Sequence, residues 1–184
     1  MTEAISPSAR DRILATALRL FYRDGLRATG IDRIIAESGV AKMSFYRHFP
    51  SKNDLVRAFL SARHDRWMGW FRAAVERRFA EDGLVAIAHA LSDWFGESDF
   101  RGCAFINTVA ETGSEFSQPV EHKRDLEAYV RELAGRLSLP SPDRIAAKAM
   151  IVIEGAIVRA QMGQTAGLEK MTIELLTDLS RSGN

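Results

Sequence analysis

The sequence predicts an all-α protein of about nine helices, in which three N-terminal helices precede a larger helical region. Along most of the 184 residues, apolar side chains recur three and four positions apart, which is the spacing of one helix face. No segment alternates apolar and polar residues, and no Asn-Gly or Asp-Gly pair joins two β-branched runs. Gly and Pro fall at intervals that suit helix ends.

The N-terminal region is expected to contain three helices. The first runs from about Ser8 to Arg23, because Ser8 and Asp11 have the spacing of a capping box and Gly25 provides a stop. The next two are shorter and are expected at residues 31–38 and 42–48, separated by Gly39 and closed by Pro50.

Six further helices are expected in the rest of the chain. Ser51 and Asp54 form a second capping box, and Ser141 with Pro142 marks another helix start. The expected ranges are 52–78, 84–95, 103–112, 119–137, 142–162 and 168–179.

Composition excludes several classes of protein. The charged fraction of 27% and the net charge of +1 are those of an ordinary soluble chain. No uncharged apolar stretch is long enough to cross a membrane, and the first residues lack the apolar core of a signal peptide, so we expect a cytoplasmic protein. Cys103 is the only cysteine, which excludes an internal disulfide and a thiolate zinc site; we expect no metal and no cofactor.

The charge is distributed unevenly. Residues 1–60 carry ten Lys or Arg and six Asp or Glu, so this third is basic while the remainder is slightly acidic. A basic first third suits a partner that carries phosphates, although a solvated surface would explain it equally well.

The segment from Ile31 to Phe49 has the pattern of a helix-turn-helix, with a tight turn at Ser38-Gly39-Val40. In such a unit the second helix lies in the major groove of DNA and its first residues reach base edges. The alternative is a three-helix bundle with a charged face. The expected DNA-binding residues are Thr29, Ala41, Lys42, Met43, Ser44, Tyr46, Arg47, His48 and Lys52.

The run from Ile35 to Leu55, with Gly25 and Thr29 upstream, resembles the DNA-binding signature of the tetracycline-repressor (TetR) family. The resemblance covers about residues 9–57; beyond them it is architectural only. The matching positions in the run are Ile35, Ala36, Gly39, Val40, Phe45, Tyr46, His48, Phe49, Lys52 and Leu55.

Two positions depart from the family pattern. Met43 stands where the family often has a small residue near the groove floor, which affects the bases that are tolerated. Gly30 stands where many members have Thr or Ser at the start of the second helix, so Thr29 is left to cap that helix and to contact phosphate.

The resemblance implies a helix-turn-helix DNA-binding domain at 1–52 and a helical domain at 53–184 that dimerises and binds a small effector. The expected helix at 142–162 is apolar on more than one face. With the helix at 168–179 it could build a four-helix interface in a two-fold homodimer. The alternative is a central core helix in a monomer.

The middle of the chain is rich in aromatic residues with a few polar residues among them, which suits an effector cavity. Taken singly, each aromatic residue is more often plain core. Glu154 lies within an apolar helix, so its carboxylate must be paired, solvated or protonated, and it could bond Arg159, a ligand or a partner subunit. The expected effector-binding residues are Trp67, Trp70, Phe71, Trp94, Cys103, Phe105, Asn107, Glu111 and Glu154.

These observations predict a ligand-responsive transcriptional repressor that a small apolar or aromatic effector releases from a roughly palindromic double-stranded operator. An activator and a DNA-independent all-α interaction module are the alternatives. The chain has no Gly-x-Ser-x-Gly, no His-Glu-x-x-His and no phosphate-binding loop, so we expect no enzymatic activity.

Overall fold

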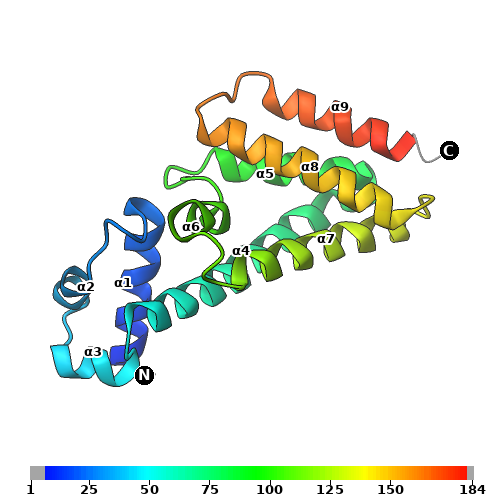
Figure 1. Cartoon of the computed structure of the whole chain (residues 1–184). Helices are drawn as coiled ribbons and strands as arrows, with labels where there is room; N and C mark the ends of the chain where they lie inside the picture. Colours follow the sequence, from blue (N-terminus) through cyan, green and yellow to red (C-terminus); the bar gives the residue numbers. More distant parts are fainter. Residues whose placement is uncertain (1–6, 182–184) are drawn as a thin grey trace, which may run out of the picture. The chain divides into compact units, whose positions relative to one another are not determined.

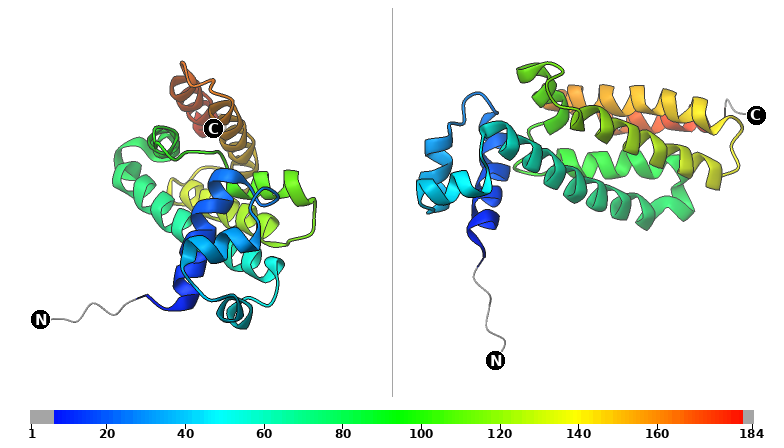
Figure 2. Two further views of the ribbon diagram at one scale, coloured as in Figure 1. Left: turned by 90° about the vertical axis from the view of Figure 1, so that its left-hand side faces the viewer. Right: turned by 60° about the horizontal axis from the view of Figure 1, so that its bottom comes forward.

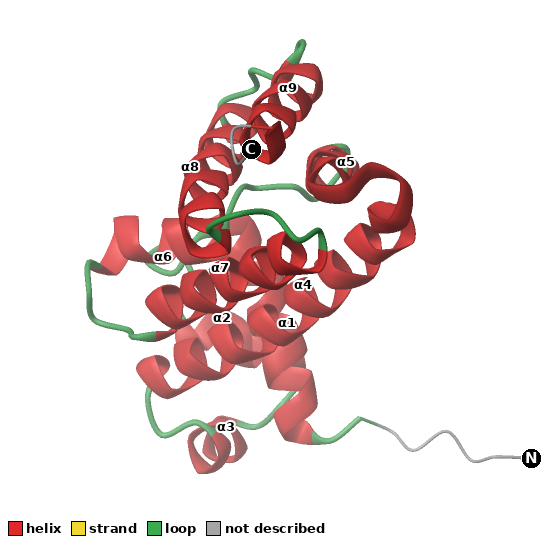
Figure 3. Ribbon diagram, turned by 90° about the vertical axis from the view of Figure 1, so that its right-hand side faces the viewer, coloured by secondary structure: helices red, strands yellow, loops and turns green. Residues whose placement is uncertain are grey.

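The computed structural model describes residues 7–181, which form nine α-helices and one 3-10 helix (η1) and contain no strand (Figures 1 and 3). This confirms the all-α prediction. The elements are α1 (Ala9–Asp24), α2 (Ile31–Ser38), α3 (Lys42–His48), α4 (Lys52–Asp82), η1 (Gly83–Val85), α5 (Ala86–Phe95), α6 (Ala104–Thr112), α7 (Gln118–Arg136), α8 (Pro142–Gln161) and α9 (Leu168–Arg181).

The described residues form two compact units. The N-terminal unit comprises residues 7–64 and 104–119, and the C-terminal unit comprises residues 65–103 and 120–181. Helix α4 therefore contributes to both units, and α6 belongs to the N-terminal unit although it is distant in sequence. The boundary between the two expected domains, at residues 52 and 53, stays a prediction. The expected domains, 1–52 and 53–184, also include residues 1–6 and 182–184, which lie outside the described residues.

The N-terminal unit is built around α1, against which α2 and α3 pack (Figure 1). Helix α1 begins as expected: the Ser8 hydroxyl accepts the Asp11 backbone N–H at 3.1 Å and donates to the Asp11 carboxylate at 2.7 Å. The apolar faces of these helices meet in a core, which removes their side chains from water. Its buried residues include Ile13, Leu20, Phe21, Ile34, Phe45, Phe49, Leu55 and Phe59.

In the C-terminal unit, α5, α8 and α9 lie side by side (Figure 2). Helices α4 and α7 are joined by a polar contact at their ends. The Arg136 guanidinium donates two hydrogen bonds to the Glu76 carboxylate, at 2.6 and 3.0 Å, and the Tyr129 hydroxyl donates a third at 3.2 Å. The hydrogen bonds from Arg136 hold the pKa of Glu76 below its usual value.

Ion pairs connect α1 to α2 at the surface of the N-terminal unit. Asp24 contacts Arg23 at 2.7 Å and Arg33 at 2.9 Å, and Glu37 contacts Arg19 at 2.7 Å and Arg33 at 2.8 Å. The hydrogen bond from Arg23, with further help from Arg33, lowers the pKa of Asp24 to about 2. The hydrogen bonds from Arg19 and Arg33 also lower the pKa of Glu37.

This network predicts an acid-sensitive contribution to stability. Because the pKa of Asp24 is depressed on folding, its contribution is present above the ordinary carboxyl value of 3.8 and is lost as the pH falls towards about 2. We expect Asp24→Asn to show a smaller fall in melting temperature between pH 4 and pH 2 than the parent, as measured by circular dichroism. The matched control is Asp99→Asn, an exposed aspartate in the C-terminal unit; an identical pH profile for the parent and Asp24→Asn would contradict the prediction.

Candidate nucleic-acid interface

Helices α2 and α3 are joined by a tight turn. Gly39 follows α2 with φ 64° and ψ 32°, the left-handed conformation that glycine adopts at little cost. A Cβ at Gly39 would meet open space, so the backbone conformation and not crowding favours glycine there. The buried Val40 then leads into α3, which gives the expected helix-turn-helix connection.

Helix α3 has two distinct faces. Phe45 is fully buried, and its ring lies 6.3 Å from that of the buried Phe49, so these two residues fix the helix against the rest of the unit. Lys42, Met43 and Arg47 lie on the solvent side, where Met43 is 88% exposed. A short helix that is packed against the core on one side and exposed to solvent on the other can enter the major groove of DNA as a rigid body.

The outer face of α3 combines cationic, polar and apolar groups. The Lys42 ammonium lies 3.5 Å from the exposed Asp32 carboxylate, and Arg47 donates a hydrogen bond of 3.5 Å to the Ser44 hydroxyl. Both cations are solvent-exposed, so these contacts hold them weakly and leave them able to meet phosphates. Of the other expected contacts, Ala41 and Tyr46 are exposed and His48 is half-buried.

Lys52 occupies a more constrained position than expected. It opens α4, whose start is fixed by reciprocal hydrogen bonds of 3.1 Å between Ser51 and Asp54, as the capping box predicts. The Lys52 ammonium donates to the backbone carbonyl of Leu26 at 2.6 Å, in the turn between α1 and α2. One ammonium hydrogen is therefore used within the protein, and two remain for a phosphate.

Glu111 lies in the N-terminal unit, where its carboxylate binds the turn between α1 and α2. It accepts the backbone N–H groups of Leu26 at 3.0 Å and Arg27 at 2.7 Å. Gly25 precedes them with φ 89°, which favours glycine, and a Cβ there would lie 2.9 Å from the Glu111 carboxylate, so a side chain would also displace this carboxylate. The structure thus gives Glu111 a role in the turn that the sequence did not indicate, and its expected contact with an effector stays a prediction.

The prediction that Thr29 caps α2 and contacts phosphate is wrong. Its side chain is fully buried, and its hydroxyl donates to the backbone carbonyl of Gly25 at 2.8 Å. The residue that precedes α2 is Gly30, which provides no side-chain cap. Thr29 instead stabilises the turn from within.

The remaining residues expected to bind an effector are divided between the two units. Phe105 and Asn107 lie on α6 in the N-terminal unit, where Phe105 is buried. The others lie in the C-terminal unit, and four of them form one aromatic cluster. Trp67 stacks on Phe71 with ring centres 4.7 Å apart, and its centre lies 5.3 Å from that of Trp94 and 6.4 Å from that of Trp70.

Cys103 is buried in the C-terminal unit, as expected for a small apolar side chain. Glu154 is both paired and partly solvated. Its side chain is 42% exposed and lies 3.4 Å from the ammonium of Lys123, so the carboxylate is not enclosed within an apolar core. Its ion-pair partner comes from α7 and was not among the candidates that the sequence suggested, which were Arg159, a ligand and a partner subunit.

No three His, Cys, Asp or Glu side chains within residues 7–181 are arranged as metal ligands. None of the helices in the same range has the length and hydropathy needed to cross a membrane.

Comparison with known proteins supports the helix-turn-helix assignment. Residues 13–59 match the family model for bacterial regulatory proteins of the tetR family. The HTH-type transcriptional repressor ComR of Escherichia coli is 25% identical over 88% of this chain and 83% of its own. The HTH-type transcriptional activator FasR of Mycolicibacterium smegmatis is 31% identical, over 53% of this chain and 44% of its own.

The fold likeness extends over both units. The crystal structure of a TetR-family transcriptional regulator from Streptomyces coelicolor has a TM-score of 0.79 and 27% identity, and 95% of each chain is covered. The larger helical region is therefore shared with solved regulators of this kind, as well as the helix-turn-helix.

The exposed face of α3 predicts a measurable electrostatic signature. We expect Arg47→Ala to reduce the slope of log affinity against log salt concentration by about 0.9 on random-sequence duplex DNA, because each neutralised phosphate releases counterions. Fluorescence anisotropy between 50 and 200 mM salt measures this slope. Arg77→Ala, at an exposed position of α4 in the C-terminal unit, is the matched control and should keep the parent slope. An unchanged slope for Arg47→Ala would remove this residue from the interface.

Proposed function

Because the chain is a DNA-binding transcriptional regulator of the TetR family, we propose that it is a homodimeric repressor that a small aromatic effector releases from its operator. The observation that carries the proposal is the arrangement of α3, in which a fully buried Phe45 fixes a face that exposes Lys42, Met43 and Arg47. Phosphate contacts from the cations would provide affinity, and base contacts from the start of α3 would provide specificity.

Repression is favoured over activation by the extent of the matches. The relative named as a repressor matches 88% of this chain, whereas the relative named as an activator matches 53%. A regulator bound across a promoter blocks transcription by occupancy alone, so repression also requires no additional contact with the transcription machinery.

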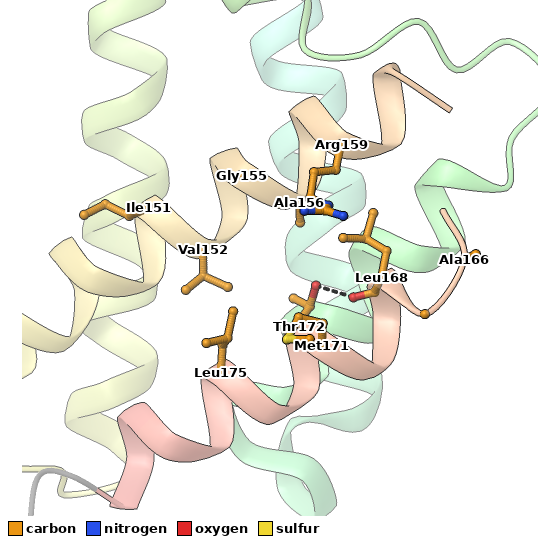
Figure 4. A pocket seen from close by; sticks show the side chains of 11 residues that line it. Ile151, Val152, Gly155, Ala156, Arg159, Ala166, Leu168, Met171, Thr172 and Leu175 are labelled. Carbon is orange, nitrogen blue, oxygen red and sulfur yellow. Dashed lines mark hydrogen bonds between the residues drawn. The ribbon is translucent and has the colours of Figure 1, made fainter. Parts of the chain in front are cut away.

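The proposed dimer uses an exposed apolar face on α8 and α9. Ile151 is 75% exposed and Met171 is 54% exposed, and Leu175 lies on the same side of α9. A groove of about 480 Å³ runs between the two helices, with Gly155 and Ala156 along its α8 side (Figure 4). Apolar patches of this kind mark protein–protein contacts.

A second copy of the chain fits this face. Helices α8 and α9 of two copies, related by a two-fold axis, would make a four-helix interface. Gly155 is exposed and a Cβ there would meet no neighbour, so a partner helix can approach the backbone of α8 closely. Two α3 helices could then read half-sites about 34–36 Å apart.

We propose that the effector binds at the aromatic cluster of the C-terminal unit, formed by Trp67, Trp70, Phe71 and Trp94. The indole Nε1 of Trp67 is buried and makes no hydrogen bond. The ammonium of Lys123 is buried too, and its ion pair with Glu154 lacks hydrogen-bond geometry. Buried donors that make no hydrogen bond favour a ligand that provides the hydrogen-bond acceptor. The effector would therefore be an aromatic molecule with an oxygen acceptor or a carboxylate.

Two segments could carry the effector signal. Helix α4 is continuous from Lys52, at the turn between α1 and α2, to Trp67 and Trp70 in the aromatic cluster. Helix α6 begins directly after Cys103 and brings Glu111 to the same turn. An effector with higher affinity for one arrangement of these helices would shift the population away from the DNA-binding form.

The first test is binding to DNA upstream of the chain's own gene. We expect a retarded band in a gel-shift titration, and its loss when simple aromatic acids are added at millimolar concentration identifies the effector class. A complete absence of retardation at low salt with excess protein would contradict the proposed repressor.

The dimer prediction is tested by Ile151→Asp. A carboxylate at the centre of the proposed interface would be desolvated without a partner, so the dimer should dissociate at micromolar concentration in analytical ultracentrifugation. Val120→Asp is the matched control, since Val120 is 53% exposed on α7 and does not line the groove. An unchanged dimer for Ile151→Asp would place the interface elsewhere.

A further inference from the structure

Met43 has the highest exposure among the large apolar side chains of the described residues, at 88%. Most of the other exposed large apolar side chains of residues 7–181 lie on α8, on α9 or directly after α8, with exposures of 41–75%, and those along the groove would be covered by the proposed dimer. Met43 lies on α3, far from that face in sequence and in the other unit. Its exposure therefore requires a separate explanation.

The position of Met43 directs it towards bases. It is the second residue of α3, and the first residues of the second helix in a helix-turn-helix are those that reach base edges. Arg47 follows four residues later, on the same face, while Phe45 anchors the opposite face in the core. Met43 thus lies among the groups that would enter the groove.

The chemistry of methionine restricts what it can recognise there. A thioether has no hydrogen to donate and is only a weak acceptor, so it is poorly suited to the polar edges of guanine, cytosine and adenine. The C5-methyl group of thymine is the apolar feature that base pairs present in the major groove. An unbranched side chain with three rotatable bonds can adapt its shape to that methyl group.

We propose that Met43 selects a thymine in each operator half-site through contact with the thymine C5-methyl group. This inference rests on the proposed entry of α3 into the major groove. Burial of one methyl group is worth about a fourfold change in affinity for each half-site. The contact adds preference for thymine over cytosine without a hydrogen bond, whereas Lys42 beside it serves phosphates.

The test begins by selecting operators from a random duplex library with the parent protein. Each thymine of the selected half-site is then replaced in turn by deoxyuridine, which lacks only the methyl group. At one position we expect the parent to lose affinity about fourfold. Met43→Ala should bind thymine and deoxyuridine equally at that position, and circular dichroism checks that this exposed substitution leaves the fold intact.

Lys42→Ala is the control from the neighbouring position, because it should weaken binding overall while keeping the ratio between thymine and deoxyuridine. If the parent binds its selected operator but every deoxyuridine substitution is neutral, the assignment of Met43 is overturned and the DNA-binding function stands. The same conclusion holds if Met43→Ala keeps the sensitivity of the parent. If the library yields no enriched sequence, the proposed operator function fails together with the inference about Met43.

Discussion

The turn between α1 and α2 depends on side chains that arrive from two later helices. The backbone N–H groups of Leu26 and Arg27 are bound by Glu111 from α6, and the carbonyl of Leu26 is bound by Lys52 from α4. Backbone N–H and C=O groups that lose contact with water need hydrogen-bond partners within the protein. Here the carboxylate of Glu111 and the ammonium of Lys52 provide charge-assisted hydrogen bonds. The direction in which α2 leaves α1 is therefore set by residues outside the helix-turn-helix itself.

The position of this turn also determines the position of the exposed face of α3. Once α2 is placed, the left-handed Gly39 and the buried Phe45 determine which side of α3 faces solvent, and so where Met43 lies. The helices that hold the turn are also those that continue into, or follow directly from, the C-terminal unit. Under the proposed mechanism, an effector needs only to favour a small displacement of α4 or α6 to disturb the support of the DNA-binding helices.

Features that depend on local sequence could be predicted, whereas those that depend on distant partners could not. Periodicity, capping boxes and glycines gave the nine helices, because each signal lies within a few residues of its effect. Glu111 contacts residues more than eighty positions away, and an acid on a helix has no signature for such a partner. Thr29 looked like a cap because Gly30, which directly precedes α2, has no side chain to do so, but the Thr29 hydroxyl turns inward. Glu154 needed a partner or water because α8 is apolar on several faces, but its partner Lys123 lies on α7, and no local signal in the sequence identifies it.

The claim that Glu111 holds the turn is tested most directly by amide hydrogen exchange at Leu26 and Arg27, measured by NMR in the parent and in Glu111→Ala. In the parent, both amides should exchange as slowly as those in the middle of α1. In Glu111→Ala the Leu26 amide should exchange roughly tenfold faster or more, because a partly buried backbone donor that loses a charged acceptor costs at least about 1.4 kcal/mol. The Arg27 amide should also exchange faster, since its exposed hydrogen bond is replaced by water. Rapid exchange of these two amides in the parent, at the rate of an open loop, would contradict the account.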